Sequence, residues 1–326
     1  MSGNVLITLF DTFLESNPSF IRMFQERGYN TIVRGDREPL SEEKLMPLIR
    51  EADAYIVGLA DVNRKVIESA TRLKVIAAFG TGYNHIDTEA ATQKGIVVAN
   101  AQGVNAVSTA ELTIGLMLDL ARSVSSSDRC IRSGEWKSSV GSELHDKVLG
   151  IIGTGKIGYE LARIAFHGFN MKILAHDVYQ NENMIKECRA QYANIDTILE
   201  NSDFVSVHIP LTEKTKGFIS LKELKKMKKS AYLINAARGG IVDEDSLYEA
   251  LVNQWIAGAA LDVYTREPPV GSRMIGLDNI ITTCHLGGST RDAIERIGKV
   301  SYENVVNVLE GKKTEYCVNP KVYDSK

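Results

Sequence analysis

The sequence predicts an α/β protein built from two doubly wound domains, each around a parallel sheet. Short apolar runs alternate with helix-like segments along both halves of the chain, as they do where helices join parallel strands. One such junction, Val148 to Phe166, carries the spacing Gly-x-Gly-x-x-Gly between its strand and its helix. The 326 residues suffice for two domains, and with 44% hydrophobic residues the chain can fill two sizeable cores.

The first hundred residues contain the first strand–helix series. An acidic first turn, Ser41-Glu-Glu43, indicates the start of one helix, and Gly28 indicates the end of another. The alternation predicts a parallel sheet with helices on both faces. Strands are expected at 5–10, 30–33, 54–57, 74–78 and 95–100, and helices at 16–28, 41–51 and 62–70.

A long apolar helix is expected at residues 107–122. It begins with Ser108-Thr-Ala-Glu111, a helix start signal, and its apolar residues lie on more than one face. Such a helix is buried either in a domain core or at an interface between domains or subunits, and the sequence does not separate these alternatives.

A second strand–helix series begins at Val148 and predicts the second sheet. The final residues, Tyr316 to Val322, are expected to add one more strand. The other strands are expected at 148–152, 172–175, 203–209, 231–235, 258–261 and 280–283, and helices at 156–166, 222–227, 245–254 and 290–311.

The glycines of the central junction predict a dinucleotide site. Gly153 permits a tight turn, Gly155 lets the backbone approach a pyrophosphate, and Gly158 lets helix and strand pack closely. The helix N-terminus offers free N–H groups and the positive end of a dipole to the phosphates. Asp177 ends the next apolar run, where it can accept hydrogen bonds from the ribose hydroxyls of NAD, and no cation follows it until Lys186. We therefore expect NAD rather than NADP.

Composition excludes several function classes. A formal net charge of −3 gives no reason to expect a nucleic-acid partner. No apolar run approaches the ~18 residues of a membrane span, and the N-terminus reads as a core strand, not a signal peptide. The cysteines, Cys130, Cys188, Cys284 and Cys317, are scattered without metal-ligand spacing. We expect reduced thiols, no metal site and a cytoplasmic protein.

Three chemically active residues follow three different predicted strands. Arg238, Glu267 and His285 each come shortly after an apolar run, and open α/β sheets bind ligands outside the carboxyl ends of their strands. Reduction of a 2-keto acid suits this trio. Arg238 can hold a carboxylate or ketone oxygen, His285 can donate a proton to the ketone oxygen, and Glu267 can favour the charged imidazolium.

Longer motifs resemble the D-isomer-specific 2-hydroxyacid dehydrogenases, over nearly the whole chain. This family includes phosphoglycerate dehydrogenases, glyoxylate and hydroxypyruvate reductases and D-lactate dehydrogenases. The motifs are Gly153-Thr-Gly-Lys-Ile-Gly158, the run from Asn201 to Thr212, Leu233-Ile-Asn-Ala-Ala-Arg-Gly239, Ala260-Leu-Asp-Val-Tyr264 with Glu267-Pro268, His285-Leu-Gly-Gly-Ser-Thr290 and Gly80-Thr-Gly-Tyr-Asn-His-Ile-Asp87.

The resemblance implies a Rossmann-type cofactor domain, residues 102–290, inserted in a flavodoxin-like substrate domain, residues 1–101 and 291–326, with the active site in the cleft between them. It implies that Arg238 binds substrate, that His285 is the acid/base with Glu267 as its partner, and that N–H groups around Thr81 and Gly82 bind the substrate carboxylate. It also implies a homodimer centred on the cofactor domain. Its implied NAD contacts are Gly153, Thr154, Gly155, Lys156, Ile157, Gly158, Asp177, His208, Pro210, Ala236, Asp262 and Gly287.

Two departures from the family pattern concern chemistry. Many members carry proline where this chain has Cys284, whose thiol we expect to be buried. Phosphoglycerate dehydrogenases of this type hold the phosphate with arginines at positions that match Gly58 and Ala78 here, which favours an unphosphorylated substrate such as glyoxylate or hydroxypyruvate. If Arg64 or Lys65 supplied a cation to the site, phosphoglycerate would remain an alternative substrate. A nucleotide-sensing corepressor with little turnover is the alternative of another class.

Overall fold

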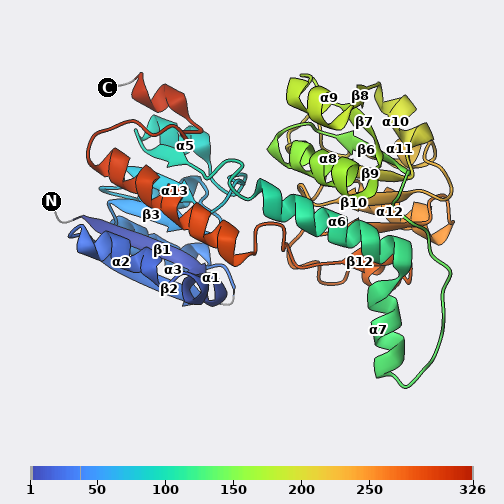
Figure 1. Cartoon of the computed structure of the whole chain (residues 1–326). Coiled ribbons are helices and arrows are strands. Elements are labelled where there is room, and N and C mark those ends of the chain that lie inside the picture. The colour runs from blue at the N-terminus through green and yellow to red at the C-terminus, as the bar shows by residue number, and fades with distance from the viewer. Residues whose placement is uncertain (1–2, 37, 325–326) are drawn as a thin grey trace. The chain divides into compact units, whose positions relative to one another are not determined.

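The computed structural model describes residues 3–36 and 38–324, and it divides the chain into two compact units (Figure 1). Unit 1 combines Met1–Asn105 with Gly288–Lys326, and unit 2 is the continuous stretch Ala106–Gly287. Each unit is built on one parallel sheet, five-stranded in unit 1 and seven-stranded in unit 2, which confirms the predicted fold class.

The sheet of unit 1 has the strand order β2-β1-β3-β4-β5, the order of flavodoxin-like folds. Its topological switch point, where the strand order reverses, lies between β1 and β3. The strands are β1 (Asn4–Phe10), β2 (Asn30–Asp36), β3 (Ala54–Val57), β4 (Val75–Ala78) and β5 (Val97–Ala99); the helices are α1 (Asp11–Ser16), α2 (Ser19–Glu26), α3 (Glu42–Arg50), α4 (Arg64–Ser69), α5 (Thr88–Gln93) and α13 (Arg291–Leu309).

Alternating side chains of the strands fill a core on each face of this sheet. Along β1, Leu6 packs on the face covered by α3, α4 and α5, whereas Val5 and Ile7 pack on the face covered by α2 and α13. All three are fully buried, as expected for a parallel sheet with helices on both sides (Figure 1). The second face depends on the C-terminal part of the chain, because Val305, Val306 and Val308 of α13 belong to its core.

Unit 2 has the strand order β12-β11-β10-β9-β6-β7-β8, so its switch point lies between β6 and β9. Helices α6 and α8 cover one face, and α10, α11 and α12 cover the other. The strands are β6 (Val148–Ile152), β7 (Lys172–His176), β8 (Gln191–Tyr192), β9 (Phe204–Val207), β10 (Tyr232–Asn235), β11 (Gly258–Leu261) and β12 (Ile280–Thr282); the helices are α6 (Ala106–Arg122), α7 (Val124–Arg132), α8 (Lys156–Phe169), α9 (Glu182–Cys188), α10 (Ile195–Asn201), α11 (Leu221–Leu224) and α12 (Glu244–Val252).

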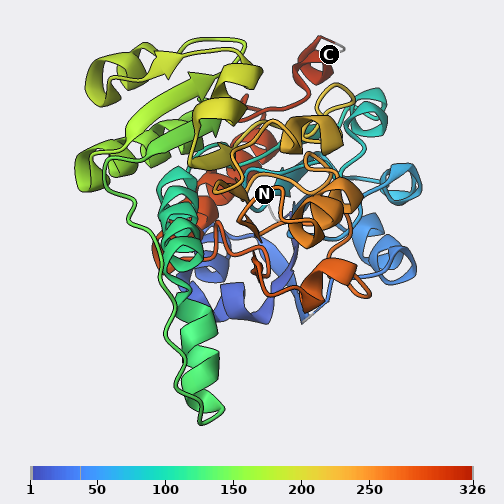
Figure 2. The ribbon, with the colours of Figure 1, turned by 90° about the vertical axis from the view of Figure 1, so that its right-hand side faces the viewer.

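Helix α7 and the segment after it form an arm that extends away from the sheet of unit 2 (Figures 1 and 2). No residue of α7 is buried, and the chain returns to the body where Ser142 N–H donates to the Ala121 carbonyl oxygen at 2.9 Å. We define the arm as residues 123–141. It exposes Val124, Ile131, Trp136 and Val140, of which Trp136 is 89% exposed.

One predicted strand is wrong. Residues 316–322 form only an isolated antiparallel bridge, Ala99 to Cys317, followed by the 3-10 turn Pro320–Tyr323. The ladder cannot continue because the side chain of Asn319, not a backbone carbonyl, accepts the N–H of Val98 at 2.8 Å.

Among the helices of the described ranges, 3–36 and 38–324, none has the length and apolar character that a membrane span requires.

Candidate active site

The glycine motif lies at the switch point of unit 2, between the ends of β6 and β9. Gly153 has φ +102°, and a Cβ there would collide with the backbone of His208. A Cβ at Gly158 would collide with the carbonyl oxygen of Gly153, whereas Gly155 faces open space. The first and third glycines are thus required by packing. The second leaves room at the N-terminus of α8, which has no side-chain cap, so the motif fits a pyrophosphate.

Asp177 follows β7 and faces the glycine loop. One of its oxygens accepts the backbone N–H of Thr154 at 2.6 Å, and the other accepts that of Val178 at 2.7 Å. The carboxylate is thereby fixed at the carboxyl end of the strand beside β6. The next cation in the chain, Lys186, pairs with Glu182 at 3.3 Å.

His208, one residue beyond β9, has one engaged and one unengaged ring nitrogen. Nε2 lies 2.8 Å from the hydroxyl of Ser206, and Nδ1 is buried without a hydrogen-bond partner in the described chain. Burial lowers the pKa of His208 to about 4, so the ring is neutral at pH 7. A buried polar atom without a partner, beside the glycine loop, fits a site completed by a bound ligand.

Arg238, Glu267 and His285 follow β10, β11 and β12, which are adjacent strands of one parallel sheet. Their carboxyl ends therefore meet at one edge. The prediction that the three residues follow three strands is confirmed, and the sheet order brings those strands together.

His285 and Glu267 form a direct pair: Nδ1 of the histidine lies 2.7 Å from Oε2 of the glutamate. Their side chains are 36% and 28% exposed. Oε1 of Glu267 accepts the N–H of Tyr264 at 3.0 Å. Burial alone would raise the pKa of Glu267, but the hydrogen bond and charge of His285, the N–H of Tyr264 and the charge of Arg238 together lower it. Glu267 is therefore a carboxylate at neutral pH.

Arg238 is a half-buried cation with unused donors. Its only side-chain hydrogen bond in the described chain goes to the carbonyl oxygen of Ala237, at 2.6 Å, and it makes no ion pair there. Burial lowers the pKa of Arg238, while the charge of Glu267 acts in the opposite direction. The guanidinium remains charged, so an anionic ligand would compensate it.

The loop that carries His285 is organised by Asp262, which is 1% exposed. Its carboxylate accepts the N–H groups of Leu286 and Gly287 at 2.7 and 2.9 Å and the hydroxyl of Thr283 at 2.7 Å. This positioning role was not expected from the sequence, which assigned Asp262 only a cofactor contact.

The turn that carries Arg238 packs on the loop that carries Glu267. A Cβ at Gly239 would collide with the carbonyl of Tyr264, so only glycine allows this approach. The amide of Asn235 donates to the carbonyl of Arg238 at 2.9 Å, and the hydroxyl of Tyr264 donates to the carbonyl of Thr283 at 2.9 Å. Sequence reasoning missed these supports, although Asn235, Gly239 and Tyr264 all lie in the quoted motifs.

In unit 1, Thr81 and Gly82 lie in the loop after β4. The Thr81 hydroxyl lies 2.9 Å from Oδ1 of Asn105, and its carbonyl accepts from the amide of Asn100 at 2.8 Å. In the described ranges, the backbone N–H groups of Thr81 and Gly82 make no hydrogen bond. The loop is anchored through other atoms, so these two donors are available to a ligand.

The remaining predicted cofactor residues lie near the same edge of unit 2. Ala236 directly follows β10, Gly287 follows the His285 loop, and Pro210 is exposed beyond β9; Lys156 and Ile157 begin α8.

The expectation that the thiol beside His285 is buried is wrong: Cys284 is exposed. The carboxylate of Asp262 holds Thr283, Leu286 and Gly287 of the loop after β12, whereas the Cys284 side chain is left exposed.

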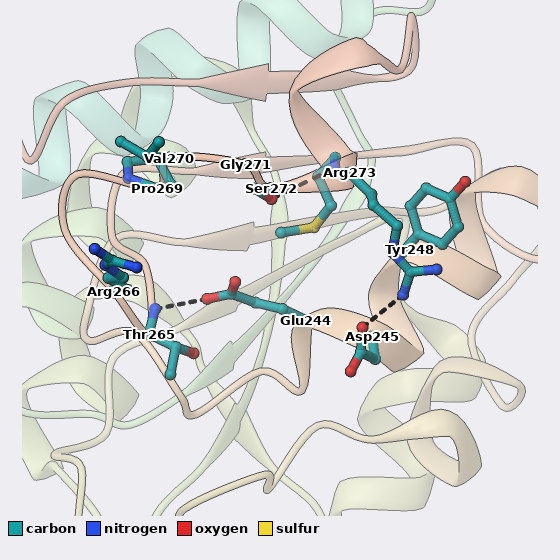
Figure 3. Close-up of a pocket in the computed structure, with 11 residues that line it drawn as sticks. Glu244, Asp245, Tyr248, Thr265, Arg266, Pro269, Val270, Gly271, Ser272 and Arg273 are labelled. Carbon is teal, nitrogen blue, oxygen red and sulfur yellow. Dashed lines mark hydrogen bonds and ion pairs between the residues drawn. The ribbon is translucent and has the colours of Figure 1, made fainter.

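A cavity of about 260 Å³ is lined in part by residues on either side of Glu267 in the chain (Figure 3). None of the three predicted catalytic side chains lines it. Glu244 of α12 accepts the N–H of Thr265 at 2.6 Å, and Arg273 pairs with Asp245 at 2.7 Å while lying over the ring of Tyr248. These contacts brace the loop that ends at Glu267.

Comparison with known proteins agrees with this geometry. Residues 114–287 match the family model described as "D-isomer specific 2-hydroxyacid dehydrogenase, NAD binding domain". The chain is 39% identical over 291 residues to a glyoxylate reductase from Thermococcus litoralis, covering 86% of this chain and 88% of that one. The structure is similar to a D-lactate dehydrogenase from Aquifex aeolicus complexed with NAD and lactic acid, with a TM-score of 0.81, 26% identity and 99% and 98% coverage.

A longer relative also matches. The chain is 40% identical over 303 residues to a D-3-phosphoglycerate dehydrogenase from Methanocaldococcus jannaschii, which covers 92% of this chain but only 57% of that protein. The chain thus spans little more than half the length of this relative. The family model, the matched relatives and the site motifs agree: the chain belongs to the D-isomer-specific 2-hydroxyacid dehydrogenase family and carries its NAD-binding domain.

Proposed function

We propose that this protein interconverts an unphosphorylated D-2-hydroxy acid and its 2-keto acid, with NAD(H) as cofactor. The observation that carries the proposal is the 2.7 Å pairing of His285 with Glu267 next to the half-buried, unpaired guanidinium of Arg238, within an NAD-binding domain. In reduction, the ketone carbon receives a hydride and the ketone oxygen receives a proton.

His285 is the proposed proton donor and acceptor. Because Glu267 engages Nδ1, Nε2 is the nitrogen left for the substrate oxygen. The imidazolium gives its proton to the ketone oxygen in reduction, and the neutral ring takes it back in oxidation. Glu267 orients the ring and stabilises its charged form, because a carboxylate beside an imidazole favours the imidazolium.

Arg238 and the loop after β4 are the proposed substrate-binding groups. Arg238 offers a planar set of N–H donors to the carboxylate or the ketone oxygen, and an anion would compensate its buried charge. The free N–H groups of Thr81 and Gly82 suit a carboxylate oxygen, which accepts strong hydrogen bonds from backbone donors.

The residues at the switch point of unit 2 fit the cofactor. We propose that the motif from Gly153 to Gly158, including Thr154, Lys156 and Ile157, binds the pyrophosphate, and that Asp177 binds the adenosine ribose. NAD(H), when bound, supplies or accepts the hydride. The other proposed contacts are His208, Pro210, Ala236, Asp262 and Gly287.

Local ion pairs support an unphosphorylated substrate. By the resemblance to phosphoglycerate dehydrogenases, Gly58 and Ala78 stand at the positions of the arginines that hold the phosphate there. The cations of Arg64-Lys65 are already engaged: Arg64 donates to Gln93 at 2.9 Å, and Lys65 lies 3.4 Å from Glu42. Glyoxylate, hydroxypyruvate and larger unphosphorylated 2-keto acids are therefore the first substrates to test, and 3-phosphoglycerate is the alternative that the longer relatives suggest.

We propose that the protein works as a homodimer whose interface includes α6 and the arm. The arm exposes four large apolar side chains, among them Trp136 and Val140, and it carries both charge signs, with Asp128 and Arg132 paired at 2.8 Å. A second copy would cover the apolar residues, and homodimers are the commonest soluble oligomers. Light scattering at micromolar concentration tests this, and a monomeric mass contradicts it.

We also propose that the protein works in the cytoplasm. The four free cysteines support such a reducing compartment.

The experiment that tests the proposed function is a steady-state assay of NADH oxidation with a panel of 2-keto acids, run beside NADH-binding measurements. Turnover of one unphosphorylated 2-keto acid supports the proposal, and a strong preference for the phosphorylated substrate favours the alternative. Tight NADH binding without turnover of any member would contradict catalysis and favour a nucleotide sensor.

A further inference from the structure

The switch point of unit 1 is lined by apolar side chains. Strand register brings Thr8, Val57 and Ala78 to one level of the adjacent strands β1, β3 and β4. Two residues further on, β1 ends at Phe10 and β3 leads to Leu59, which is 44% exposed. Ligands of open α/β sheets bind outside the carboxyl ends of the strands at such a switch point, so these side chains stand where a ligand is expected.

Three phenylalanines form a continuous aromatic row there. The ring of Phe13 lies 5.9 Å from that of Phe10 and 6.0 Å from that of Phe79, with which it is stacked. Phe79 is held in place by the core, because the centroid of its ring lies 5.5 Å from that of the buried Phe20 ring. Phe10 and Phe13 are only half-buried and belong to no core cluster. We call Phe10, Phe13, Leu59 and Phe79 the aromatic wall.

The aromatic wall adjoins the loop that has free backbone donors. Phe79 is two residues before Thr81, whose N–H group and that of Gly82 make no hydrogen bond in the described residues. The stretches that carry the wall, residues 10–13, 58–61 and 79–83, contain two aspartates and no lysine or arginine. A ligand whose carboxylate binds these N–H groups would therefore meet apolar side chains from these three stretches, which supply no cation.

We propose that the aromatic wall binds the side chain of the substrate, and that this side chain is a branched aliphatic or aromatic group. The inference rests on the proposed function, which supplies the 2-keto acid and its carboxylate-binding loop. Glyoxylate has no side chain to contact the wall, that of hydroxypyruvate is a hydroxymethyl, and the stretches that carry the wall offer no cation to a phosphate. An isobutyl or benzyl group would cover the half-buried rings of Phe10 and Phe13, and an apolar pocket distinguishes substrates by tenfold or more for a single methylene group.

The test compares catalytic efficiency for four 2-keto acids: glyoxylate, hydroxypyruvate, 4-methyl-2-oxopentanoate and phenylpyruvate. We expect one of the two apolar substrates to exceed glyoxylate by at least about tenfold in kcat/KM. Phe13→Ala should lower kcat/KM for the apolar substrates by about tenfold and leave that for glyoxylate within about twofold, while Phe13→Leu retains most of the preference. Activity with glyoxylate shows that each variant is folded.

Phe166→Ala is the matched control, because Phe166 is also a half-buried phenylalanine but lies in unit 2 against His167 and Arg189. Its substrate preference should equal that of the wild type. If glyoxylate or hydroxypyruvate is the best substrate, or if Phe13→Ala changes all four efficiencies equally, the inference is overturned and the proposed function stands. If no 2-keto acid is reduced, the proposed function fails and the inference fails with it.

Discussion

The backbone N–H of His285 donates to the carbonyl oxygen of Asp262 at 2.9 Å, while the carboxylate of Asp262 accepts the next two N–H groups of the chain. His285 has φ +56°, a left-handed conformation that is uncommon outside glycine. The aspartate therefore holds the histidine in a backbone conformation that it would not favour alone.

Asp262→Asn tests this positioning role. The amide cannot accept at both of its side-chain atoms, so at least one of the three side-chain hydrogen bonds is lost. We expect kcat to fall by up to about 10²-fold, the typical consequence of a catalytic group displaced by about 1 Å. Asp243→Asn, which changes the cap of α12, is the control and should keep full turnover. Weaker NADH binding with an unchanged kcat would argue for a cofactor contact instead.

His285→Ala removes the proposed proton donor. We expect kcat for reduction to fall by about 10²–10⁴-fold, because general acid catalysis contributes about that factor. The dissociation constant of NADH, measured by fluorescence titration, should change less than threefold, a margin far below the catalytic loss. Near-normal turnover in this variant would show that another group supplies the proton.

Glu267→Gln tests the pairing through its pH dependence. The pKa of Glu267 is lowered in the folded protein, so its carboxylate stays charged through the ordinary titration range of a glutamate and is protonated only as the pH falls below that range. Wild-type reduction should therefore persist down to about pH 5. The glutamine of the variant does not titrate, so the decline of reduction on the acid side of the wild-type profile should be absent in the variant. An identical pH–rate profile for the two proteins would contradict the pairing.

His208→Gln should make the apoprotein less sensitive to acid. The pKa of His208 is lowered to about 4 by burial, so between pH 6.5 and 4 the unfolded chain binds a proton that the folded chain does not. The free energy of unfolding of the wild type therefore falls as the pH drops through this window, and the variant should lose less. His145→Gln, which changes an exposed histidine, is the control for denaturation curves at pH 7 and pH 4.5. Equal losses in all three proteins would refute the effect.

Asp177→Ser tests cofactor choice. The wild type should prefer NADH over NADPH by at least about tenfold in kcat/KM, or 1.4 kcal/mol, because the 2′-phosphate of NADPH would face the carboxylate with no nearby cation. The variant should narrow that gap chiefly by improving NADPH use. Equal kcat/KM values of the wild type with NADH and NADPH would contradict the proposed role of Asp177 in selecting NADH.

Elements with strong periodicity were predicted closely, whereas elements defined by tertiary contacts were not. The strand over 258–261 and the long helix near 107–122 agree with the structure to within a residue, because their apolar residues are buried. Helix α7 was not predicted, since it buries no side chain and shows no apolar stripe facing the body. The helix expected at 16–28 begins only after Pro18. The tail strand failed because Asn319 takes the place of a ladder carbonyl.

The chemical residues of the site could be identified from the sequence, but their supports could not. Arg238, Glu267 and His285 follow strands, and a parallel sheet brings strand ends to one edge regardless of loop detail. The packing of Gly239 against Tyr264 and the bonds that Asp262 makes depend on how loops from adjacent strands meet. Such contacts have no local pattern, because each joins residues more than twenty positions apart in the chain.

Unit 1 combines two segments that lie far apart in the sequence, so its folding cannot be completed in the order in which the chain is synthesised. Strands β1 to β5 are synthesised before α13, so one face of their sheet, which α2 covers in part, is fully covered only nearly two hundred residues later. Unit 2, which is continuous, can fold while Val5 and Ile7 still lack that cover. Until then the apolar residues that α13 will cover stay exposed in the nascent chain, and such transiently exposed surface is prone to aggregation.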